Sequence, residues 1–150
     1  MLKKKARKKK KCDICGRSHY KLTRRQCVQR TLWSTLKEGI TLRDRGLCQK
    51  CGRACRGDES HMSHVYRASR CGRLKFNEDN VKILCSHCHR GWWHNNEAEA
   101  GVWFSQTFPD RWERLSIKII EYRDSIGTIS MPWYLERLDQ LREYVLDQKG

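Results

Sequence analysis

The chain has 150 residues, with 32 Lys and Arg against 17 Asp and Glu, so its formal net charge is +15 at pH 7. This length suits one compact domain with a tail rather than two full domains. No apolar run reaches the roughly 18 residues of a spanning helix, and the basic N-terminus lacks the apolar stretch of a secretory signal. We therefore expect a cytoplasmic protein that makes no membrane contact.

The positive charge is concentrated at the N-terminus. Residues 1–30 hold 13 Lys and Arg against a single acid, Asp13. Eight of these cations lie in residues 1–11, which we expect to form a disordered basic tail: Lys3, Lys4, Lys5, Arg7, Lys8, Lys9, Lys10 and Lys11. A Lys placed on a phosphate releases counterions and adds affinity without regard to base sequence. We interpret the tail as a nucleic-acid-binding arm, with a solvated tail or an address signal as the alternative.

A group of Cys and His residues follows the tail in a small segment, residues 12–30. Its members are Cys12, Cys15, His19 and Cys27. Three thiols and one imidazole are a ligand set of structural zinc, so this segment could hold a second zinc ion. A helical segment without metal is the alternative.

Three stretches show the spacing of one helical face, with apolar residues every three to four positions: residues 23–44, 108–124 and 132–147. We expect the first helix to break or end around Gly39, because glycine is a weak helix former. Residues 95–104 begin with capping residues followed by helix formers, which predicts another helix. The Trp and Phe residues of the stretch 92–112 are expected to pack these helices together rather than to stack on bases.

The middle of the chain predicts short strands. Residues 55–66 contain a Gly-Asp turn and then "SHMSHVY", whose branched and aromatic end suits a strand, so we expect a short hairpin there. Residues 71–80 are loop-like, and "VKILC" is an apolar run that leads into a Cys pair. The sequence therefore predicts an α+β fold, a small zinc-stapled core with flanking helices.

Two Cys-x-x-Cys pairs predict a zinc site, with 33 residues between them: Cys48, Cys51, Cys85 and Cys88. Four thiolates close the tetrahedral shell of structural zinc, and such a site contributes free energy of folding. The second pair is followed by His89 and so also matches a haem-attachment motif, but that attachment requires export from the cytosol. Cys55 and Cys71 have no partner pattern, so we expect them to be small core residues.

Five of the six histidines fall within residues 61–94, which is unusual for surface residues. The segments "GLCQKCG", "SHMSHVY" and "KFNEDNVKILCSHCHRGWWH" resemble the HNH endonuclease family of the ββα-metal fold. The resemblance is to its zinc-stapled phage members, such as the NinG/Rap-like and endonuclease VII-like recombination nucleases. It implies an HNH core in residues 31–105 and a helical C-terminal subdomain in residues 106–150.

The resemblance implies roles for individual residues. His64 would be the general base, Asn80 would fix the imidazole, and His89 would bind a catalytic divalent ion such as Mg²⁺. Many members carry Asp or His just before the base, where this chain has Ser63, so His61 or His94 would have to supply the missing ligand. The N-terminal Cys group also departs from NinG-like proteins, because Arg30 stands where a fourth Cys is expected.

The chemistry of phosphodiester hydrolysis agrees with such a set. A neutral imidazole can deprotonate water near pH 7, and a divalent cation stabilises charge on the phosphoryl oxygens. We therefore predict a divalent-metal-dependent DNA endonuclease of phage or mobile-element origin, with recombination intermediates as one candidate substrate. Cleavage of junctions would suit a homodimer. The alternatives are a non-catalytic zinc-finger protein that binds nucleic acid and a zinc-dependent protein-interaction module.

Overall fold

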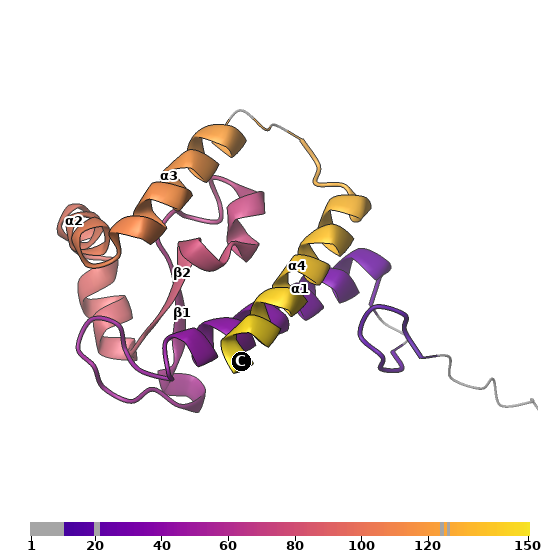
Figure 1. The fold of residues 1–150 in the computed structure, drawn as a ribbon, viewed down its shortest axis with the longest axis horizontal. Helices are drawn as coiled ribbons and strands as arrows, with labels where there is room; N and C mark the ends of the chain where they lie inside the picture. The colour runs from indigo at the N-terminus through magenta and orange to yellow at the C-terminus, as the bar shows by residue number, and fades with distance from the viewer. Residues whose placement is uncertain (1–10, 20–21, 124, 126) are drawn as a thin grey trace, which may run out of the picture.

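The computed structural model describes residues 11–19, 22–123, 125 and 127–150. Within them the fold is α+β, with helices surrounding a two-stranded sheet (Figure 1). This confirms the predicted α+β class, whereas the HNH core stays a prediction. The basic residues of the tail before Lys11 lie outside the described residues. No helix in the described ranges is long and apolar enough to cross a membrane.

Helices α1 (Arg24–Arg43) and α4 (Met131–Lys149) lie side by side along most of their length (Figure 1). The hydroxyl of Thr23 caps the start of α1. The predicted break at Gly39 is wrong, because α1 continues through it. A Cβ atom at Gly39 would lie 2.6 Å from the Tyr144 ring of α4. This glycine therefore permits close helix packing, which outweighs its weak helix propensity.

Strands β1 (His61–His64) and β2 (Val81–Leu84) form the sheet. They run antiparallel, with His64 opposite Val81. The predicted hairpin within residues 55–66 is therefore wrong, because the partner of β1 follows the intervening residues 65–80. All four β2 residues are buried, including Lys82.

The C-terminal end of α1 is joined to β2 by charged hydrogen bonds. The Arg43 guanidinium donates to the carbonyls of Glu78 and Val81, at 2.7 Å each. The buried Asp44 carboxylate accepts from the backbone N–H of Ile83 at 2.8 Å. These bonds satisfy polar groups that would otherwise be buried unpaired, and they fix the position of the sheet on α1.

A π-helical segment, η4 (His87–Trp93), follows β2 and precedes α2 (Glu97–Thr107) and α3 (Pro109–Arg123). The helices predicted in residues 95–104 and 108–124 are confirmed as α2 and α3. Aromatic rings join the three elements, for example Trp92 and Trp103 with centroids 5.3 Å apart. The aromatic residues after His89 therefore pack helices, as predicted.

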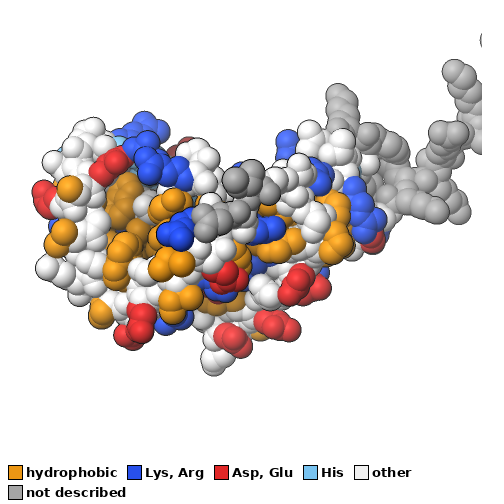
Figure 2. All heavy atoms as spheres, turned by 90° about the horizontal axis from the view of Figure 1, so that it is seen from above, with side chains coloured by type: hydrophobic (Ala, Val, Ile, Leu, Met, Phe, Trp, Pro, Cys, Tyr) orange, Lys and Arg blue, Asp and Glu red, His pale blue; other side chains and the backbone are white. Residues whose placement is uncertain are grey.

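The surface charge is unevenly distributed. On the face that Figure 2 shows, most acidic side chains lie toward one edge and most Lys and Arg toward the other. Such separation leaves a positive surface on which a polyanion can lie.

Candidate metal centres and active-site cleft

The four thiols predicted to bind zinc meet in the structure. Their sulfur atoms lie within 4.8 Å of one another: Cys48, Cys51, Cys85 and Cys88. The sulfurs of Cys51 and Cys85 are 3.9 Å apart, close to the roughly 3.8 Å edge of a tetrahedron with Zn–S bonds of about 2.3 Å. The donor set and its spacing therefore fit a structural zinc ion.

The acidity of these thiols also favours a cation. Burial raises the pKa of Cys48, but backbone N–H groups of Cys51 and Cys85 outweigh it and lower the pKa to about 7. Cys88 has a raised pKa because it is buried and because the neighbouring thiols resist a second negative charge. The thiols cannot all ionise in one place unless a cation neutralises them, and Zn²⁺ would do so.

A second cluster, also within 4.8 Å, comprises Cys12, Cys15, His19 and Cys27. Backbone N–H groups of Cys15 and Ile14 lower the pKa of Cys12 to about 6, whereas burial and the nearby thiols raise that of Cys27 to about 12. The cluster could hold a second zinc ion, as the sequence suggested. Cys27 lies on α1, so this ion would fasten the N-terminal segment to the helix.

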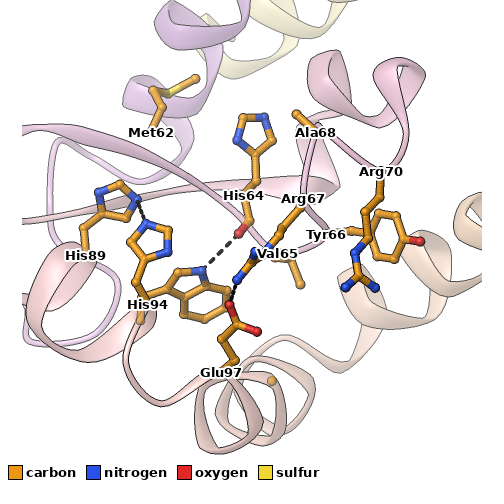
Figure 3. A pocket seen from close by; sticks show the side chains of 12 residues that line it. Met62, His64, Val65, Tyr66, Arg67, Ala68, Arg70, His89, His94 and Glu97 are labelled. Carbon is orange, nitrogen blue, oxygen red and sulfur yellow. Dashed lines mark hydrogen bonds and ion pairs between the residues drawn. The ribbon is translucent and has the colours of Figure 1, made fainter.

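A cleft of about 490 Å³ lies beside the sheet (Figure 3). Its wall includes His64 at the end of β1, His89 from η4, and His94 just after η4. Arg70 contributes positive charge to the same wall, and Arg67 lies there paired with Glu97. The cleft thus combines three of the histidines singled out in the sequence.

The His64 imidazole is held by two neighbours. Its Nε2 lies 3.1 Å from the Lys75 carbonyl oxygen, which can only accept. The proton is therefore on Nε2, and Nδ1 is left as a proton acceptor. Trp33 of α1 stacks on the ring, with centroids 5.7 Å apart. Burial, and then the positive charges of Lys82 and Lys75, lower the pKa of His64, so the neutral form predominates at pH 7.

His89 contacts one histidine through each ring nitrogen. Its Nδ1 is 3.0 Å from Nδ1 of His61, and its Nε2 is 3.1 Å from Nε2 of His94. The π-helical turn makes the second contact, because it places residues five apart on one face. Burial, and then charge on His94 and His61, lower the pKa of His89 to about 4, so it is a neutral ligand at pH 7.

Asn80 does not line the cleft and does not contact His64. Its buried amide accepts from the Tyr66 N–H at 2.7 Å and donates to the carbonyls of Tyr66 and Leu74. Its backbone carbonyl accepts from the Val65 N–H at 2.8 Å. Asn80 thus holds the two residues that follow His64, and the carbonyl that holds the imidazole belongs to Lys75.

Two buried polar groups lie on the face of the sheet opposite His64. Ser63 and Lys82 are paired across the strands, and both are fully buried. Neither polar atom has a hydrogen-bond partner among the described residues. The Lys82 amine lies 3.1 Å from the centroid of the Trp93 ring. Burial and then the Arg111 charge lower the pKa of Lys82 well below its ordinary value, despite an opposing effect of Asp44.

Lys82→Met should raise the free energy of unfolding by about 1–3 kcal/mol at pH 7, because it removes an amine that is buried without a hydrogen bond. The native pKa lies below the unfolded one, so the unfolded chain binds the extra proton and wild-type stability falls as pH drops below about 10.5. The advantage of the variant should therefore shrink toward pH 10. Urea denaturation of zinc-loaded protein at pH 7 and 10 measures it. A less stable variant would show that the amine makes a net favourable contact.

Sequence reasoning did not find Trp33, Lys75, Arg67 or Arg70, which surround the histidines. Their proximity depends on tertiary packing and leaves no local motif. Comparison of the chain with protein-family models, curated proteins and solved structures finds no match. The resemblance to HNH endonucleases therefore stays a prediction.

Proposed function

We propose that the protein is a divalent-metal-dependent endonuclease of the HNH type that hydrolyses DNA phosphodiester bonds. The observation that carries the proposal is a single cleft in which a neutral, oriented imidazole, His64, accompanies a pair of imidazoles, His89 and His94. Strand, loop, strand and helical turn follow one another around it, an order compatible with a ββα-metal core.

The residues divide the chemistry between them. His64 is the general base: Nδ1 accepts the proton of the attacking water while Nε2 remains bonded to the Lys75 carbonyl, which also stabilises the imidazolium that forms. Arg70 is exposed on the cleft wall and can bind a phosphate oxygen of the substrate. Asn80 acts as a positioning residue through the backbone that follows His64.

His89 and His94 would hold the divalent ion. Their Nε2 atoms already approach to 3.1 Å, and both residues line the cleft. His61 lies on the other side of the His89 ring, where its contact with Nδ1 fixes the tautomer and leaves Nε2 for the ion. When bound, the ion would stabilise negative charge on the phosphoryl and leaving oxygens.

His94→Ala should therefore weaken divalent-ion binding more than His61→Ala does. We expect roughly 10- to 100-fold weaker binding for the loss of the orienting residue, and a larger loss for the direct ligand. Calorimetric titration of zinc-loaded protein with Mn²⁺ measures both. The reverse order would assign the ligand role to His61.

The direct test of the proposal is incubation of zinc-loaded protein with supercoiled plasmid. We expect nicked or linear product with Mg²⁺ or Mn²⁺ and none without a divalent ion. A four-way junction of the same length as a linear duplex, tested in parallel, shows whether recombination intermediates are preferred. Binding without cleavage across Mg²⁺, Mn²⁺, Ni²⁺ and Co²⁺ would instead support the zinc-finger binding protein. Absence of both activities would support the protein-interaction module.

The tail should contribute affinity rather than chemistry. Deleting residues 1–11 removes eight cations and no acid, so the salt slope of duplex binding should shrink by about 0.9 for each phosphate that the tail neutralises in the full chain. Cleavage by saturated complex should change little, because a tethered arm binds ground and transition states about equally. Fluorescence anisotropy at several salt concentrations measures the slope. An unchanged slope would mean that the tail does not touch DNA.

A further inference from the structure

A second hollow lies on α1, outside the histidine cleft. Its volume is about 480 Å³, and we call it the α1 hollow; it is lined by Gln26, Gln29, Arg30, Trp33, Ser34 and Lys75. Residues 26, 30, 33 and 34 recur at helical spacing, so they share one face of α1. Apart from the indole, every lining residue is polar or basic. The hollow thus has one aromatic surface and several polar and basic groups, and its size suits a small ligand.

The α1 hollow adjoins His64 through two of its lining residues. Trp33 lines the hollow and stacks on the His64 ring, with an interplanar angle of 17°. Lys75 lines the hollow with its side chain and accepts the His64 hydrogen bond with its carbonyl. A molecule in this hollow therefore contacts two residues that hold the proposed general base.

The charge of this face favours an anion. The residues that line the hollow include two cations, Arg30 and Lys75, and no acid. Helix N-termini usually favour acids, yet the first turn of α1 has none. Among the described residues Arg30 is exposed and has no hydrogen bond or ion pair. An unpaired guanidinium beside an aromatic ring suits a ligand with both a phosphate and a planar ring.

We propose that the α1 hollow binds one unpaired nucleotide of the nucleic acid, next to the phosphate that faces His64. The base stacks on Trp33, and Arg30 and Lys75 bind the flanking phosphates. A base must leave the duplex stack to reach the indole, so the preferred substrates carry an unpaired nucleotide at the cut site. This assignment rests on the proposed function for the role of His64, whereas the binding itself requires no cleavage.

The first test is binding of a fluorescein-labelled octathymidylate to full-length, zinc-loaded protein without added divalent ion. Trp33→Ala should weaken binding about tenfold, and Trp33→Phe should restore most of it, because the stacking surface returns. Arg30→Gln should lower the salt slope by about 0.7. Lys118→Gln on α3 removes the same charge elsewhere and should leave affinity and slope nearly unchanged. A blunt duplex should be insensitive to Trp33→Ala.

Crosslinking provides a second and local readout. Octathymidylate carrying one 5-iodouracil should crosslink on irradiation to the peptide that contains Trp33. Crosslinks confined to Trp112 or Trp133, or equal binding by the Arg30, Trp33 and Lys118 variants, would overturn the proposal. Arg30 is exposed, so its variant remains informative if Trp33→Ala fails to fold. If the wild-type protein never nicks plasmid but shows the expected binding and crosslinking, the proposed nuclease activity is refuted and the proposed nucleotide site in the α1 hollow is not.

Discussion

His64→Ala should reduce plasmid nicking by about 10²- to 10⁴-fold, which is the usual contribution of a positioned general base. The native imidazole is oriented by the Lys75 carbonyl and by Trp33, so no neighbouring side chain can take over the same geometry. Zinc content and DNA affinity should stay close to wild type, because the imidazole is not part of either thiol cluster. Nicking time courses measure the cleavage rate, and a chromogenic chelator measures the zinc content.

The control is His87→Ala, which removes an exposed imidazole that does not line the cleft. This variant should nick like wild type. The pH dependence gives an independent check: because burial lowers the pKa of His64 below 6.5, more than half of the imidazole is neutral at pH 6.5 and the acid limb of nicking should lie below that pH. Wild-type nicking by His64→Ala would remove His64 from the mechanism and move the search to His61.

The sequence was most informative where the chemistry is local. A Cys-x-x-Cys pair places two thiols on one turn of the chain, and two such pairs can share a metal ion only if they lie together. This cluster could therefore be predicted without knowledge of the tertiary structure: Cys48, Cys51, Cys85 and Cys88. Cys12 and Cys15 form another such pair, and the structure places His19 and Cys27 beside it, as the sequence left open. Helix bounds were predictable for the same reason, because apolar spacing and caps are local.

The sequence failed where distant packing decides the structure. From the sequence alone, Gly39 suggests a break in the first helix. In the structure, the same glycine lets Tyr144 of α4 approach α1. The pairing of β1 with β2 spans residues 65–80, which no short-range turn signal indicates. Likewise, only a π-helical turn brings His94 onto His89, whereas ordinary helical spacing would separate them.

Cys48→Ser should unfold the protein rather than merely slow its chemistry. The Cys48 thiol is buried and belongs to the zinc cluster. This cluster joins the chain before β1, which carries Cys48 and Cys51, to the chain after β2, which carries Cys85 and Cys88. Zinc binding in small domains contributes about 10–16 kcal/mol, whereas domains of this size are stable by only about 5–15 kcal/mol. Loss of one of four ligands is expected to release the ion, and the binding free energy lost with it is enough to unfold the core.

Cys55→Ser is the matched control, because Cys55 is also buried and lies close to the same cluster without being a member of it. Its thiol donates to the Arg53 carbonyl at 3.5 Å, and a serine hydroxyl can donate to the same oxygen. We expect it to keep its zinc and to lose no more than about 1–2 kcal/mol of stability. Circular dichroism melts with zinc quantification separate the two variants. Equal zinc loss from both would mean that Cys55 takes part in the metal shell and that one of the four assigned thiols does not.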